Sequence, residues 1–134
     1  MTFPLTRKYR ANVQPVGTTA TLLDIVDRAV ESETVSSVVY IPKAGVNGAA
    51  TNNRTFNLLN RGTAGTGTVN VASLTLASGT NLSDNVPQAL TLSTTSANLL
   101  LTAGQVLEWE STPNGTGLAD PGGMVEVNTT RTVS

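Results

Sequence analysis

Residues 99–127, LLLTAGQVLEWESTPNGTGLADPGGMVEV, decide the fold of this chain. They contain its only tryptophan, two apolar runs and two glycine-rich connections. Ala103-Gly104 separates residues 99–102 from residues 105–110, and a glycine between two β-prone runs predicts a hairpin. Residues 111–123 hold Pro-Asn-Gly and Asp-Pro-Gly-Gly, which favour turns over regular structure. The stretch therefore predicts strand, tight turn, strand, long loop and strand.

The second of these runs has two distinct faces. Side chains alternate along a strand, so Leu107 and Trp109 share one face, while Val106, Glu108 and Glu110 share the other. We expect the tryptophan face to lie in a core and the glutamate face to meet water. The stretch is the centre of a predicted β-sandwich.

The composition limits the classes of protein that this chain resembles. Its 134 residues suit one domain with a modest core. Only 13% are charged, with 8 basic against 9 acidic residues, which disfavours the basic surface that nucleic acid requires. The absence of His and Cys excludes disulfides, Cys-based zinc sites and His-based catalysis. We also expect no membrane span or signal peptide, because no apolar run is long enough.

The rest of the chain favours short strands. Thr and Val runs, bounded by Gly, Pro and Asn, recur at intervals of about ten residues, which is typical of a sandwich or jelly roll. The predicted strands are residues 35–41, 55–60, 68–76, 89–93, 97–102, 105–110 and 124–127. We expect an all-β, jelly-roll-like antiparallel β-sandwich over residues 18–134, with an extended N-terminal arm and room for one short helix.

The N-terminal residues 1–17 form the predicted arm. They are polar, carry an isolated basic cluster and end in the break Pro15-Val16-Gly17. Such an arm becomes ordered against a partner or by strand addition. A frayed terminus or a first edge strand is the alternative. If the segment is an arm, the residues that bind a partner or a neighbouring copy are Arg7, Lys8, Tyr9 and Arg10.

Residues 21–31 favour a short helix. Their apolar side chains follow a helical stripe, with acidic and basic residues opposite. The stripe consists of Leu22, Ile25, Val26, Ala29 and Val30. A strand stays open, because tertiary context overrides local pattern in short segments.

Few side chains indicate chemistry. Glu108 and Glu110 share a strand face, as paired carboxylates of a glycosidase do, but any solvent-facing strand has this spacing. Asp120, with Asn114 and Asp84, has oxygen ligands of the type that Ca²⁺ prefers, although Asp-Pro-Gly is first a turn. We predict no catalytic, cofactor-binding or metal-binding residues, and no enzymatic activity.

Residues 48–79 and 101–127 carry a resemblance to a known family. Asn-Arg-Thr enters strand 55–60 and Asn-Arg-Gly leaves it, so Arg54 and Arg61 bracket it, either as partner contacts or to solvate its ends. Ala-Gly precedes the tryptophan strand, and Gly-Thr-Gly with Asp-Pro-Gly-Gly precedes the last strand. This pattern, over residues 35–127, resembles the capsid decoration (cement) proteins of tailed bacteriophage heads.

The resemblance implies a jelly-roll-like sandwich on the outer surface of the virion head. Such a protein forms a homodimer or homotrimer and ties neighbouring major capsid subunits together, with no cofactor, nucleic acid or membrane partner. The alternative function is a carbohydrate- or cell-surface-binding β-sandwich, a fibre or lectin-like module. It would use the loop at residues 111–123, with Trp109 and Asp120 as contacts. A third hypothesis is a small hydrolase that uses Glu108 and Glu110.

Overall fold

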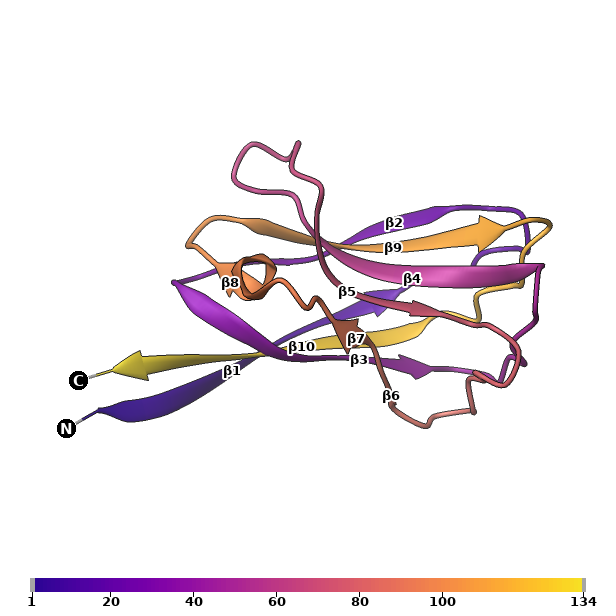
Figure 1. Cartoon of the computed structure of the whole chain (residues 1–134), viewed down its shortest axis with the longest axis horizontal. Helices are drawn as coiled ribbons and strands as arrows, with labels where there is room; N and C mark the ends of the chain where they lie inside the picture. Colours follow the sequence, from indigo (N-terminus) through magenta and orange to yellow (C-terminus); the bar gives the residue numbers. More distant parts are fainter. Residues whose placement is uncertain (1, 134) are drawn as a thin grey trace.

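The chain folds into two packed antiparallel sheets, seen in the computed structural model, which describes residues 2–133 (Figure 1). Sheet 1 has the order β1 (Phe3–Val13), β10 (Gly123–Val133), β3 (Glu33–Pro42) and β6 (Gln88–Ala89), with β8 (Leu100–Leu101) also pairing with β3. Sheet 2 has the order β2 (Leu22–Arg28), β9 (Val106–Asn114), β4 (Asn53–Asn60), β5 (Val69–Thr75) and β7 (Thr91–Leu92). A 3-10 turn, η1, covers Ser96–Leu99. No helix in the described part of the chain is long and apolar enough to cross a membrane.

The pairing of the strands is that of a jelly roll. β1 pairs with β10, β2 with β9, β3 with β8 and β4 with β5, as in one long hairpin folded over on itself. The chain crosses from one sheet to the other between β1 and β2, β2 and β3, β3 and β4, and β9 and β10, whereas β4 and β5 are neighbours in sheet 2. The apolar face of each sheet covers the other. The predicted all-β, jelly-roll-like sandwich is confirmed.

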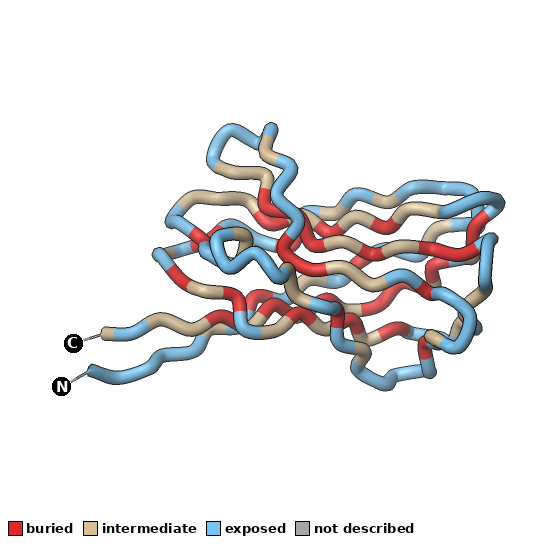
Figure 2. The backbone as a smooth tube through the Cα atoms, viewed as in Figure 1, coloured by how far each residue is buried: buried red, intermediate tan, exposed pale blue. Residues whose placement is uncertain are grey.

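Three aromatic rings hold the centre of the core. The ring centroids of Tyr40, Phe56 and Trp109 lie 5.0 to 5.4 Å apart, and all three side chains are fully buried. Leu107 is buried on the same face of β9, whereas its neighbours on the strand are only partly buried. Figure 2 shows this alternation of buried and more exposed positions along the central strands. The prediction that the tryptophan face points into the core is confirmed.

The predicted hairpin about Ala103-Gly104 is wrong. β8 pairs with β3 in sheet 1, whereas β9 pairs with β2 and β4 in sheet 2, so this turn carries the chain from one sheet to the other. Leu101 and Leu107 then enter the same core from opposite sides. The residues that favour a tight turn are the same whether the two flanking strands pair with each other or lie in different sheets. The loop prediction is also too long, because β9 runs on to Asn114.

The predicted helix at residues 21–31 is also wrong, because this segment contains strand β2. A β-bulge lies between Ile25 and Asp27, where the register with β9 shifts by one residue. The bulge leaves Leu22 half-buried and Val26 and Ala29 buried, at spacings of four and three residues. One extra residue in a period-two strand thus produces the spacing of a helical stripe.

The N-terminal segment adopts the edge-strand alternative. β1 pairs with β10 along its whole length, from Phe3 opposite Val133 to Val13 opposite Gly123. Tyr9 and Val13 of this strand belong to the core. Residues 3–6 and 130–133 are exposed or only partly buried and extend away from the sandwich as two paired strands (Figure 1). We call this projection the terminal ribbon.

Candidate interaction surface

Two of the predicted partner-binding residues face solvent at the base of the terminal ribbon. Lys8 and Arg10 lie on one face of β1, with side chains 41% and 58% exposed. Both approach Glu126 of β10, at 3.6 Å from Lys8 Nζ and 3.4 Å from Arg10 Nε. Because two cations share one carboxylate, this face keeps a positive charge. Lys8 and Arg10 therefore form an exposed basic patch on β1.

The other two predicted residues, Arg7 and Tyr9, point to the opposite face and bind Glu33. Arg7 Nε donates to Glu33 Oε1 at 2.7 Å, and the Tyr9 hydroxyl donates to the same oxygen at 3.1 Å. The hydroxyl of Thr129, on β10, donates a hydrogen bond to Glu33 Oε2. Tyr9 is buried, so its side chain contacts the protein's own interior. We call Glu33, Arg7, Tyr9 and Thr129 the Glu33 cluster.

The Glu33 cluster joins three strands through one ionised carboxylate. Burial by itself raises the pKa of Glu33, but hydrogen bonds from Thr129, Arg7 and Tyr9 outweigh it and hold that pKa below the ordinary value. Burial raises the pKa of Tyr9. Glu31 adds an outer pair, with Arg131 Nε at 2.7 Å. Strands β1, β3 and β10 are therefore fixed to one another where the ribbon leaves the sandwich.

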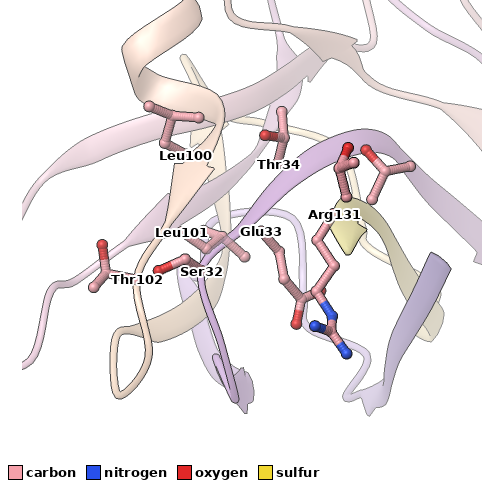
Figure 3. A pocket seen from close by; sticks show the side chains of 9 residues that line it. Ser32, Glu33, Thr34, Leu100, Leu101, Thr102 and Arg131 are labelled. Atoms are coloured by element: carbon pink, nitrogen blue, oxygen red, sulfur yellow. The ribbon is translucent and has the colours of Figure 1, made fainter. Parts of the chain in front are cut away.

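Two cavities open at this same end of the molecule. The first, of about 370 Å³, is lined by residues 32–34, 100–102 and 130–132 (Figure 3). The second, of about 430 Å³, lies between Val30 and the Ala103-Gly104 turn. Exposed apolar side chains lie at this end: Leu100 and Val30 line the two cavities and are each 56% exposed, and Phe3 and Leu5 on the terminal ribbon are 52% and 41% exposed. We call this region the ribbon end.

Arg54 is a buried structural residue, whereas the sequence predicted a partner contact or a solvated strand end. Its guanidinium is fully buried and donates to the Leu118 carbonyl at 2.6 Å and to Ser111 Oγ at 3.0 Å. It also donates to the carbonyls of Gly17, Thr18 and Ala20. Burial lowers the pKa of Arg54. It is thus neither a partner contact nor a solvated strand end, and no local signal marks it, because the carbonyls come from distant loops.

The contacts expected for glycan binding are not at the surface. Trp109 is fully buried and Asp120 is 1% exposed. The Asp120 carboxylate accepts hydrogen bonds from the Tyr40 hydroxyl at 2.6 Å and the Gly122 amide at 3.0 Å. Neither side chain can stack on or bind an external sugar. The alternative function therefore loses the two residues on which it depended.

The paired glutamates are on the outer face of sheet 2, as expected. Glu108 accepts from Arg61 Nε at 2.8 Å, and Glu110 accepts from Asn57 Nδ2 at 3.0 Å. Each carboxylate is thus held by its own neighbour on the sheet. Across residues 2–133, the structure groups no three His, Cys, Asp or Glu side chains in a way that could hold a metal ion.

The comparisons with known proteins give no close relative. No protein-family model and no curated protein matches the chain. Two solved structures of infectious bursal disease virus match, the Gx strain at TM-score 0.32 and 12% identity and the Gt strain at 0.26 and 16%. They cover 98% and 99% of this chain, which spans only 31% and 33% of theirs. TM-scores this low do not establish a common fold.

Proposed function

We propose that this chain is a virion structural protein, a capsid decoration or cement subunit that binds the outside of a head shell. Its partners are the major capsid protein and further copies of itself, and it has no catalytic activity. The resemblance of residues 48–79 and 101–127 to tailed-phage decoration proteins supports this role. So does the jelly-roll sandwich, which is the fold that the resemblance implies.

The observation that carries the proposal is the ribbon end. A cement subunit needs contact area and fixed shape rather than titrating catalytic groups. Here two paired strand ends project from a rigid sandwich, with a polar cluster holding their base and apolar side chains near their tips. Lys8 and Arg10 add positive charge on the outer face of the same strand. The ribbon end therefore offers separate apolar and charged contact areas.

The first test is density-gradient sedimentation of the source lysate, with the chain followed by an antibody. We expect it to migrate with intact particles at many copies per particle. If the chain stays at the top of the gradient while particles sediment, the proposed role fails.

A second test locates the capsid contact on the charged face. Lys8→Gln/Arg10→Gln should lower the number of copies bound per particle, because it removes the two cations that face solvent on β1. Raised salt should lower wild-type binding in the same direction, since exposed charges are screened. Lys43→Gln, an exposed lysine beyond the far end of β3, is the matched control. Equal loss in the control, or full occupancy in the double variant, would refute this contact.

A further inference from the structure

Sheet 1 has a vacant strand position at the ribbon end. Within residues 2–133, the pairing of β10 with β3 stops at Thr130 opposite Thr34, while β10 itself continues to Val133. On the other side of β3, β8 pairs through Leu101 opposite Glu33. Because β3 begins at Glu33, no strand of the described chain continues its path between the end of β10 and β8.

This vacant position is the cavity of about 370 Å³ described above. Figure 3 shows Leu100, Leu101 and Thr102 on one side, Arg131 on the other, and Ser32 and Glu33 between them. Two strands that flank a third lie about 9–10 Å apart, which is the width of one extended chain. We call this cavity the strand slot.

The lining of the strand slot selects an uncharged, partly apolar segment. Leu100 is 56% exposed and offers an apolar wall, and threonines supply most of the polar wall. The charged lining groups already have partners, because Glu33 binds Arg7 and Arg131 binds Glu31. A charged segment would therefore find no free counter-charge, whereas apolar and hydroxyl side chains would bury favourably.

The chain itself carries a segment of this chemistry in the tip of its terminal ribbon. Residues 2–6, TFPLT, have no charged side chain, and Phe3 and Leu5 are 52% and 41% exposed. About four extended residues span some 13 Å, enough to cover the roughly 10 Å of the three β10 residues that do not pair with β3. The tip cannot reach its own slot, because β1 lies on the opposite side of β10 from β3.

We propose that the strand slot receives the ribbon tip, residues 3–6, of a second copy of this chain. Phe3 and Leu5 of one copy pack against Leu100 of the next, beside the free edge of β10. Pro4 has no amide proton, so side-chain burial rather than a long backbone ladder holds the contact. This inference rests on the proposed function, and it names the two surfaces through which copies of the chain bind each other.

The proposed contact joins two different surfaces, and this determines how it closes. Tip and slot lie at the same end of the molecule, so two copies facing each other can exchange tips reciprocally. A ring of copies, each tip entering the next slot, is the other closed arrangement. The mass of the purified protein by light scattering separates the two.

Cysteine cross-linking of purified protein tests the contact directly. The native chain has no cysteine, so each introduced thiol is unique. Leu5→Cys is mixed with a larger-tagged Leu100→Cys and treated with a short bismaleimide, so that any mixed product is intermolecular. The matched control is Leu5→Cys with Val86→Cys. Val86 is similarly exposed, at 52%, but lies at the far end of β3, because the backbone amide of the preceding Asn85 donates to the Pro42 carbonyl.

The expected result is a mixed product with Leu100→Cys at least tenfold above that with Val86→Cys. Equal yields, or a product that forms only between two Leu5→Cys chains, would overturn the slot contact. The second outcome would indicate pairing between the β1 edges of two copies instead.

Removing the apolar tip gives an independent measurement. Phe3→Thr/Leu5→Thr should convert the oligomer to monomer by light scattering, with the melting temperature of the sandwich unchanged. Leu23→Thr/Ile25→Thr, which replaces exposed apolar residues on β2, is the matched control and should stay oligomeric. A wild-type protein that is monomeric at every concentration overturns the inference. If that monomer still sediments with particles, the proposed function stands and only the self-contact fails.

Discussion

Glu33 connects the two ends of the chain to the rest of the protein. Its carboxylate is buried and accepts hydrogen bonds from Arg7, Tyr9 and Thr129, which come from the first and last strands. A buried charge is costly unless donors surround it, and here three donors do so. The terminal ribbon therefore leaves the sandwich from a fixed base.

Replacing Glu33 should make the protein less stable and less sensitive to acid. Because the pKa of Glu33 is lowered in the folded state, the ionised carboxylate stabilises the fold above the unfolded-state pKa. That stability is lost as the pH falls through the folded-state value. Glu33→Gln should lower the free energy of unfolding by about 2 kcal/mol at pH 7, as for hydrogen bonds to charged groups. Urea titrations at pH 7 and pH 3 should show the difference from wild type shrinking at the lower pH.

Glu126→Gln is the matched control for this prediction. Glu126 also lies beside two cations, but Lys8 and Arg10 are largely exposed, and exposed ion pairs contribute about 0–1 kcal/mol. If Glu33→Gln is no more destabilising than this control, Glu33 does not hold the ribbon base.

Arg54 should not tolerate replacement by lysine. Its planar guanidinium donates to Ser111 and to four carbonyls, a geometry that a single ammonium cannot reproduce. The carbonyls are those of Gly17, Thr18, Ala20 and Leu118. Leaving buried carbonyls unpartnered costs about 1–3 kcal/mol each, so we expect a loss of about 3 kcal/mol in urea unfolding. Arg61→Lys, at a partly exposed pair with Glu108, should cost under about 1 kcal/mol. Equal effects would contradict the structural role of Arg54.

At the scale of the element, the bulge in β2 decides which side chains it buries. A helical stripe would bury both Ile25 and Val26, whereas the strand leaves Ile25 66% exposed and Val26 7% exposed. The bulge adds one residue to the strand, and the inward positions become Leu22, Val26 and Ala29. Local periodicity cannot reveal a bulge, since its cause is the pairing with β9.

This difference predicts that the same substitution has unequal effects on stability at two adjacent positions. Ile25→Thr should change the free energy of unfolding by no more than about 0.5 kcal/mol, as at other surface sites. Val26→Thr places a hydroxyl in the core and should cost about 1–3 kcal/mol. Urea unfolding of the two variants measures both. A large loss at Ile25 would contradict the strand geometry.

At the scale of the whole molecule, β1 has two parts with different roles. Residues 3–6 project as the ribbon tip, whereas Tyr9 and Val13 belong to the core. Deleting residues 2–6 should therefore leave a cooperative unfolding transition within a few degrees of wild type. Deleting residues 2–13 should abolish this transition, because β10 then loses its pairing with β1 along the whole length of the strand. Calorimetry distinguishes the two, and a stable longer deletion would show that β1 is dispensable.

The position of the functional surface depends on this whole-molecule arrangement. The basic residues at 7, 8 and 10 stand out in the sequence, yet strand alternation sends Arg7 to Glu33 and leaves only Lys8 and Arg10 outside. The strand slot has no sequence signal at all. It is formed by residues 32–34, 100–102 and 130–132, which are far apart in the chain and meet only when β8 and β10 pair with β3 in sheet 1.

The sequence by itself determined the fold class, the inward face of Trp109 and most strand positions, because alternation and turn chemistry are local properties. Only the tertiary structure decided that residues 22–28 form a strand, that β8 and β9 lie in different sheets, and that Arg54 is buried. Each of these depends on a partner far away in the chain. Pairing between distant segments sets register, bulges and burial, and no window of neighbouring residues contains that information.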